Sequence, residues 1–251
     1  MSMIGLLIAA LFLPLFPMSM VFNLVYTRVR HPFLRSIILI AWPLCGLLAI
    51  KFFSVSIPYW VTTWAVLTSI LYALRALALR EVGLWTAFIG TSAWSLIWIL
   101  EADSTSLVEL TLFAVGISVP LALLALLTSG LEKRYGAAYL GLYGGLAQTI
   151  PRFSGVLVGV ILAVIATPLF PTFFAMLSMI IKSTPVSPYV AMGVGLIWLI
   201  WSWAGAKLLQ GLIVGQKQTA IADMSKIDMW LYVATLTALV IGGVYWLGAM
   251  V

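Results

Sequence analysis

Long apolar runs, each close to the length of a membrane-spanning helix, constrain this chain more than any other feature. A spanning helix needs about 20 consecutive, mainly apolar residues. The runs bounded by charged residues, prolines and glycines give eight predicted spans: Met3–Tyr26, Pro32–Phe53, Tyr59–Leu79, Gly83–Leu100, Leu107–Gly130, Ile150–Ile181, Tyr189–Ile213 and Met229–Met250. Only 8% of the residues are charged and 64% are hydrophobic, which excludes a soluble enzyme, a disordered tail and a collagen-like fibre. The sequence predicts an all-α, polytopic transmembrane helix bundle. No basic residue precedes the first run, so we expect a retained helix rather than a cleaved signal peptide.

The placement of the basic residues predicts how the chain crosses the membrane. Lys51 and Lys182 fall in loops on one side. The other basic residues fall in the odd-numbered loops or at the adjoining helix ends: Arg28, Arg30, Arg35, Arg75, Arg80, Lys133, Arg134, Arg152, Lys207, Lys217 and Lys226. Cytoplasmic loops carry an excess of Lys and Arg. We therefore expect a bacterial inner-membrane protein with both termini outside. The net charge of +6 then needs no nucleic-acid partner.

The chain lacks the residues that most catalytic and metal sites require. It has one cysteine, Cys45, inside an apolar run where we expect a small buried side chain, and one histidine, His31, in a basic loop. Cysteine clusters and multi-histidine metal sites are therefore excluded, and a Ser-His-Asp triad is disfavoured. We expect no catalytic residue, no cofactor, no metal and no enzymatic activity.

The sixth run predicts a discontinuous helix. Its 32 residues would span about 48 Å as one helix, against about 30 Å of hydrocarbon. Pro168 and Pro171 each remove a backbone donor and clash with a preceding carbonyl, so the helix should break there, beside Thr167. A tilted and kinked helix is the alternative. Broken backbone at membrane depth is tolerated only inside protein or beside a wet cavity, and it often marks ion sites in transporters.

Five motifs in order resemble the antiporter-like proton-channel subunits of respiratory complex I and their relatives, the Mrp antiporters and the membrane subunit of DAB-type inorganic carbon pumps. They are Leu126–Arg134 (LLTSGLEKR), Tyr143–Ala147 (YGGLA), Ile150–Arg152 (IPR), Leu162–Met176 (LAVIATPLFPTFFAM) and Lys207–Gly215 (KLLQGLIVG). The resemblance implies N-terminal helices over residues 1–82, an antiporter-like repeat region over 83–215, and a loop with a C-terminal helix over 216–251. Family members are about twice this long and carry two inverted repeats, so we expect a single repeat here.

The resemblance also implies where a proton path should lie. The family keeps a His, often with a Lys, in the helix that matches Leu107–Gly130, and a Glu or Lys just after the helix break. Alignment to the motifs puts Ser118, Ala122 and Met176 at these positions. None of the three side chains can titrate, so the proton path of the family is degenerate in this chain.

Three other features have a structural and a functional interpretation. Lys207 is expected to anchor its helix at the interface by snorkelling, with a residual ion or lipid contact as the alternative. Gly155 and Gly159 form a G-x-x-x-G pattern that predicts close helix packing, with a neighbour inside this chain favoured over a second chain. Trp198, Trp201 and Trp203 are expected to fill a protein or lipid interface rather than bind a cofactor.

Two functions are compatible with these sequence features. The first is an accessory, non-conducting membrane subunit that docks on a full-length antiporter-like subunit of an ion-coupled complex. Candidate assemblies are an inorganic carbon uptake system, favoured by size, a complex I-like or hydrogenase assembly, and an Mrp-type assembly. The alternative is a proton or sodium transporter in its own right, acting as a homodimer, with Thr167, Thr172 and Ser178 lining a hydrated half-channel.

Overall fold

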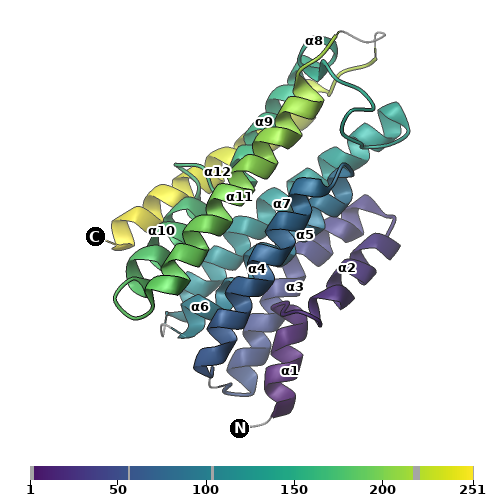
Figure 1. Cartoon of the computed structure of the whole chain (residues 1–251). Helices are drawn as coiled ribbons and strands as arrows, with labels where there is room; N and C mark the ends of the chain where they lie inside the picture. The colour runs from purple at the N-terminus through teal and green to yellow at the C-terminus, as the bar shows by residue number, and fades with distance from the viewer. Residues whose placement is uncertain (1–2, 56, 103–104, 217–220, 251) are drawn as a thin grey trace.

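The computed structural model describes residues 3–55, 57–102, 105–216 and 221–250, with side chains as far as residue 245. Over these residues the chain forms a bundle of helices without a strand, which confirms the predicted fold class (Figure 1). The helices are α1 (Met3–Phe12), α2 (Ser19–Arg28), α3 (Pro32–Phe52), α4 (Tyr59–Ala78), α5 (Val82–Ser95), α6 (Ile97–Ala102), α7 (Leu107–Tyr135), α8 (Leu146–Thr149), α9 (Pro151–Val164), α10 (Pro171–Ser183), α11 (Pro188–Ile213) and α12 (Lys226–Met250).

Six stretches of helix are long and apolar enough to cross a membrane, and each overlaps a predicted span. They are Pro32–Phe52, Tyr59–Ala78, Val82–Ala102, Leu107–Tyr135, Pro188–Ile213 and Lys226–Tyr245. The third of them is interrupted at Leu96, between α5 and α6. The fourth begins with a capping box between Ser106 and Glu109, and it ends where Gly136 takes a left-handed conformation. The two remaining predicted spans are pairs of short helices.

The first predicted span is not one helix, so that expectation is wrong. Helix α1 ends at Phe12 and α2 begins at Ser19. Pro14 and Pro17 lie in the interruption, and each of them removes a backbone donor that a continuous helix would need. The proline rule that we applied to the sixth run applies equally here.

The sixth predicted span is also a pair of helices. Helix α9 ends at Val164 and α10 begins at Pro171, so Thr167 and Pro168 lie in the interruption and Pro171 opens the second helix. Ala166 and Leu169 have φ angles of 56° and 88°, a left-handed conformation that residues with a Cβ rarely adopt. The backbone therefore turns sharply between the two halves.

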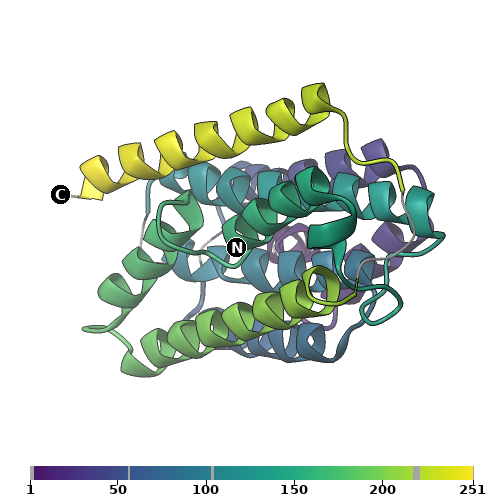
Figure 2. The same cartoon turned by 90° about the horizontal axis from the view of Figure 1, so that it is seen from above.

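Burial divides the helices into a centre and a periphery. Nearly every residue of α5 and α6 is buried, and these helices lie between α2, α4 and α7. Helix α12 is the opposite case, because it lies along the outside of the bundle against α9 and α10 and stays largely exposed (Figure 2).

Cys45 is exposed on α3, so the expectation of a buried cysteine is wrong. The apolar run that contains Cys45 faces outward at that position.

The charged residues separate toward the two ends of the bundle, as the sequence predicts. Arg28 ends α2, Arg75 lies in the last turn of α4, and Lys133 and Arg134 lie in the last turn of α7. Lys51 and Lys182 lie in the last turns of α3 and α10 instead. Lys217, which the topology prediction counted among the basic residues, lies outside the described residues.

Candidate functional site: two helix breaks and a neutral polar network

At the first break, between α1 and α2, side chains from the surrounding helices donate hydrogen bonds to the backbone. A helix end leaves carbonyl groups without an intrahelical partner, and a buried carbonyl without a hydrogen bond is costly. Four side chains donate to carbonyl oxygens at this break: Trp42 to Leu11 at 3.2 Å, Trp98 to Leu13 at 2.9 Å, Ser95 to Pro14 at 2.9 Å and Trp64 to Phe16 at 2.7 Å. In addition, the backbone N–H of Phe16 donates to the hydroxyl of Thr68 at 3.2 Å. Protein donors thus occupy positions that water would take in a hydrated break.

At the second break, between α9 and α10, the backbone carbonyls also accept hydrogen bonds from side chains, and two of the donors belong to the interrupted span itself. The indole of Trp198, on α11, donates to the carbonyl of Ala166 at 3.1 Å. The hydroxyl of Thr172 donates to the carbonyl of Ala163 at 3.2 Å, and that of Thr167 donates to Leu162 at 2.9 Å. The two threonines that the transporter hypothesis places in a hydrated half-channel therefore cap the backbone. Ser178, the third residue of that set, is buried on α10.

One tetrapeptide lies at both breaks, and sequence analysis missed this repeat. Pro14–Pro17 and Pro168–Pro171 both read Pro-Leu-Phe-Pro. The two interrupted spans run in opposite directions, since α1 leads to α2 toward the α8 end of the bundle while α9 leads to α10 away from it (Figure 1). A comparison of the chain with itself, around the prolines, would have found the first break.

Glycines on neighbouring helices allow close packing around both breaks. A Cβ on Gly46 of α3 would lie 2.6 Å from the Leu13 side chain, and one on Gly205 of α11 would lie 2.6 Å from Ile165. On α12, a Cβ on Gly243 would collide with the carbonyl oxygen of Leu169. A side chain at any of these glycines would force the neighbouring residue to move. The glycines therefore let the backbones of α3, α11 and α12 pack directly against the residues of the breaks.

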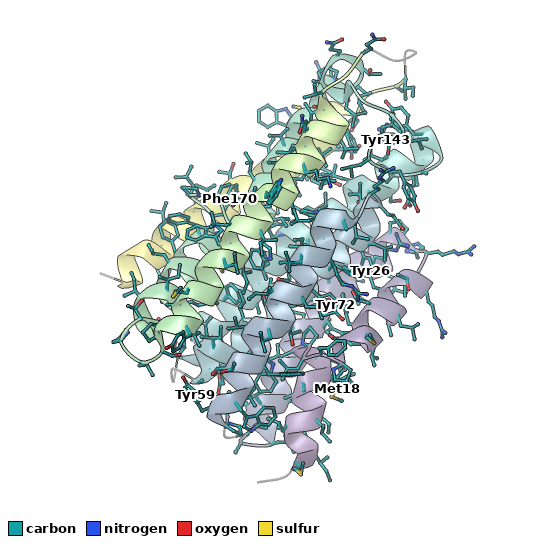
Figure 3. The ribbon with its side chains drawn as sticks, viewed as in Figure 1. Met18, Tyr26, Tyr59, Tyr72, Tyr143 and Phe170 are labelled. Atoms are coloured by element: carbon teal, nitrogen blue, oxygen red, sulfur yellow. The ribbon has the colours of Figure 1, made fainter. Side chains whose placement is uncertain are left out.

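Neutral polar groups form hydrogen bonds in the buried centre of the bundle. The hydroxyls of Ser19 and Tyr72 are 2.8 Å apart, and Figure 3 shows Tyr72 close to α2. Farther along, the hydroxyls of Ser69 and Ser92 are 2.8 Å apart, and the indole of Trp201 donates to Ser92 at 2.9 Å. Hydroxyl and indole groups can order water or hold helices in register, but they do not change charge near neutral pH.

The three predicted proton-path positions are all buried in the bundle. Ser118 is fully buried on α7 and accepts a hydrogen bond from the indole of Trp94 at 3.1 Å. Ala122 is also buried on α7, and its carbonyl accepts from the hydroxyl of Ser36 at 3.0 Å. Met176 is fully buried on α10. A charged side chain buried at any of these positions would be costly unless it had a polar partner or water.

Lys207 and the glycine pair contact neighbouring helices in different ways. Lys207 is exposed, and its ammonium donates at 2.9 Å to the carbonyl of Leu77, in the last turn of α4. Gly159 packs on α12, where a Cβ would lie 3.0 Å from Leu236. At Gly155 nothing lies within 4 Å of that place. The predicted packing to an internal neighbour therefore fails at Gly155, because α12 contacts α9 one turn farther along.

Ion pairs within the described residues lie toward the ends of the bundle. We call the end of the bundle that carries Arg28, Arg75, Lys133 and Arg134 the basic end. Arg35 is 3.9 Å from Glu132 at this end, and Lys182 is 3.9 Å from Glu109 at the other end. At the basic end, the carboxylate of Glu81 raises the pKa of the loop residue Tyr139, whose hydroxyl donates to it at 3.3 Å. Among the described residues no group of three His, Cys, Asp or Glu side chains could hold a metal ion.

An acidic cap fixes the loop before α12 against the start of α9. The carboxylate of Asp223 accepts from the backbone N–H of Arg152 at 2.9 Å and from that of Phe153 at 3.1 Å. The guanidinium of Arg134 donates to the carbonyl of Ala222 at 3.1 Å. A carboxylate at a helix N-terminus is favourable because it meets unpaired N–H groups. Arg134 and Arg152 enter the sequence predictions as topology markers and as motif residues, and this contact was not predicted.

No protein-family model matches the sequence, and no curated protein is significantly similar to it. Solved structures do match. A chain of respiratory complex I from Thermus thermophilus superposes with a TM-score of 0.83 at 20% identity, over 96% of this chain and 54% of that one. A chain of an archaeal membrane-bound sulfane sulfur reductase gives 0.81 at 16% identity, over 96% and 52%. A chain of the Mrp complex from Dietzia sp. gives 0.69 at 20% identity, over 84% and 41%.

These comparisons confirm, at the level of the fold, the resemblance that the sequence motifs predict. The chain spans about half the length of the solved chains that it matches. All three matches belong to multi-subunit membrane complexes by their descriptions. The chain therefore has the fold of these membrane-complex chains over about half of their length.

Proposed function

We propose that this protein is an accessory, non-conducting subunit of an ion-coupled membrane complex, and that it is not itself an enzyme. The observation that carries the proposal is the chemistry of the buried centre. Ser118, Ala122 and Met176 are buried and cannot titrate, and indole or hydroxyl donors occupy the carbonyls of both breaks.

A proton path needs groups that bind and release protons, or a continuous file of water between such groups. Ionisable residues within a membrane are costly, so proteins keep them there for function. Among the described residues, the ion pairs and free charges of this chain lie near the ends of helices. The interior retains the shape of a transport fold without the charges that would drive a proton through it.

The partner that we propose is a full-length antiporter-like membrane subunit, or another subunit of the same complex. The solved relatives come from assemblies of this kind, including respiratory complex I and the Mrp complex. Among the candidate assemblies we favour proton-coupled inorganic carbon uptake. Complex I-like, hydrogenase and Mrp-type assemblies are the others. The distribution of basic residues supports an inner-membrane location with both termini outside.

Flux measurements in liposomes test the non-conducting role. We expect the purified protein, with a pH gradient or a sodium gradient imposed, to pass no more protons or sodium than empty vesicles. A channel-forming peptide in parallel vesicles would verify that the dyes report flux. Saturable flux that grows with the amount of protein would contradict the proposal and favour the alternative, a transporter in its own right acting as a homodimer.

Co-purification tests the accessory role. A tagged chain extracted in mild detergent should bring with it a second membrane subunit in a fixed ratio, and deletion of the chain should inactivate or destabilise that partner complex. A chain that purifies alone from its native membrane, and whose deletion leaves every ion-coupled complex intact, would refute the accessory role even if it passed no ions.

A further inference from the structure

Two adjoining hollows open at the basic end of the bundle, where α2 meets α4 and α5. The larger one, of about 260 Å³, is lined by residues of α2, among them Met20, Asn23 and Leu24, by Tyr72 and Arg75 of α4, and by Phe88 of α5. The smaller one, of about 150 Å³, is lined by Tyr26, Arg35 and Glu81. Thr27 and Leu84 line both hollows. The two hollows therefore adjoin at these residues, and we name them together the α2–α4 groove.

Arg75 places an uncompensated positive charge in this groove. Its guanidinium carbon lies 5.9 Å from the centre of the Phe88 ring, which holds the charge over an aromatic wall. The described ion pairs are those of Arg35 with Glu132 and of Lys182 with Glu109, so Arg75 has no acidic partner among the described residues. Arg80 follows the end of α4 at the same end of the bundle, against Glu81 in the smaller hollow. The mouth of the groove thus favours an anion.

Tyr26 supplies an independent indication that the groove holds a polar ligand. Its side chain is 1% exposed, yet its hydroxyl has no hydrogen-bond partner among the described groups. The ring lies beside Arg35, whose guanidinium carbon is 5.4 Å from the ring centre, and Figure 3 shows Tyr26 on α2 at this side of the bundle. A buried hydroxyl without a partner is costly, so a ligand group in the smaller hollow would satisfy it.

The wall of the groove continues as an apolar surface toward the middle of the membrane. Leu24 and Met20 lie along α2 below Thr27 and are about half exposed. From Thr27 to Met20 the helix descends about 10 Å at 1.5 Å per residue. This is the direction and the depth that the upper part of a lipid acyl chain would occupy beneath a headgroup held at Arg75.

We propose that the α2–α4 groove binds one anionic glycerophospholipid with a hydroxylated headgroup. The phosphate lies at Arg75, the headgroup hydroxyls reach the hydroxyl of Tyr26 and the carboxylate of Glu81, and an acyl chain follows Leu24 and Met20. Basic pockets between transmembrane helices on the cytoplasmic side are suited to anionic headgroups. The bound lipid would fill the surface between α2 and the central helices.

Native mass spectrometry of the delipidated protein in detergent tests this proposal. The probes are phosphatidylglycerol, phosphatidylcholine and inorganic phosphate, each added over the same concentration range. We expect one tight phosphatidylglycerol adduct, with phosphatidylcholine at least fivefold weaker and no adduct with phosphate alone. Equal affinity for the two lipids, or a phosphate adduct as strong as that of the anionic lipid, would overturn the proposal.

Four variants locate the site. Arg75→Gln should weaken the phosphatidylglycerol adduct about fivefold, as expected for one basic residue at an anionic headgroup, and Tyr26→Phe should reduce the preference over phosphatidylcholine. Arg30→Gln is the matched control, because it removes the same charge from the same end outside the groove. Leu24→Trp leaves the charge unchanged but fills the groove at an exposed position, so it keeps the test decisive if Arg75→Gln misfolds. An adduct unchanged in Leu24→Trp, or lost equally in Arg30→Gln, would refute the site.

Discussion

Replacing Trp98 by Phe tests whether the first helix break depends on side-chain donors. Trp98 is fully buried on α6, and its indole N–H makes the only described hydrogen bond to the carbonyl of Leu13, at 2.9 Å. Phenylalanine keeps most of the ring in place but has no donor. The substitution therefore leaves one buried carbonyl unsatisfied where α1 ends.

The size of the effect follows from two contributions. Leaving a buried polar group without its hydrogen-bond partner costs about 1–3 kcal/mol. Within a membrane the average cost is smaller, about 0.6 kcal/mol, because the unfolded chain there also finds partners. The smaller ring adds a void, although Phe retains most of the contacts that a Trp-to-Ala change would lose at about 3–5 kcal/mol. We expect the free energy of unfolding to fall by about 1–3 kcal/mol.

Unfolding in mixed micelles of mild detergent and dodecyl sulfate, followed by circular dichroism at a helical wavelength, measures this change. Trp203→Phe is the matched control, because it makes the same chemical change at a side chain that is 66% exposed, and it should shift the free energy by less than about 0.5 kcal/mol. Equal stability of Trp98→Phe and Trp203→Phe would refute the view that indole donors maintain the break.

Three further substitutions probe the second break and the loop that fixes it. Gly243→Val should displace α12 from Leu169, since even a Cβ collides there. Faster hydrogen exchange over α9 and α10 would show this displacement. Gly195→Val, at an open position, is the control and should change the exchange little. Asp223→Ala should cost about 0.5–2 kcal/mol by removing the cap of α9, and an unchanged melting temperature would contradict it. Met176→Ala should cost about 2–5 kcal/mol through lost packing. Met176→Glu should pass no protons in liposomes, because Ser118 and Ala122, the other two predicted path positions, cannot titrate. Proton flux through Met176→Glu would show that a proton path survives.

Sequence patterns predicted the helical spans because membrane insertion makes their requirements local. A run of about 20 apolar residues is sufficient to specify a spanning helix, and six of the eight predicted spans coincide with long helices. The break at Pro168 and Pro171 follows from the same kind of local rule. The break at Pro14 and Pro17 was missed although the same rule applies, because the length of the first run gave no warning; it is short enough to cross the membrane as one helix.

The candidate site depended on contacts that sequence periodicity does not encode. Ser118 and Met176 could be placed through motif alignment, but their burial and the bond from Trp94 to Ser118 arise from helices that meet only in the folded chain. Asp223 and Arg152 are separated by 71 residues in the sequence, and only the fold brings the carboxylate to the start of α9. The internal neighbour of Gly155 could not be predicted for the same reason, since the route of α12 leaves Gly155 open and covers Gly159.

The tryptophans show how a feature of composition can have two physical causes. Eleven Trp residues suit a protein with aromatic belts at two lipid interfaces, and Trp60, Trp203 and Trp230 are exposed as such belts require. Others serve the interior instead, because the indole N–H is a donor that never competes as an acceptor. The described indoles that donate to a break or to a buried hydroxyl are those of Trp42, Trp64, Trp94, Trp98, Trp198 and Trp201. A large ring that caps a carbonyl also excludes the water that could otherwise carry a proton past it. Under the proposed non-conducting role, the indoles that donate to the two helix breaks would also oppose conduction through them.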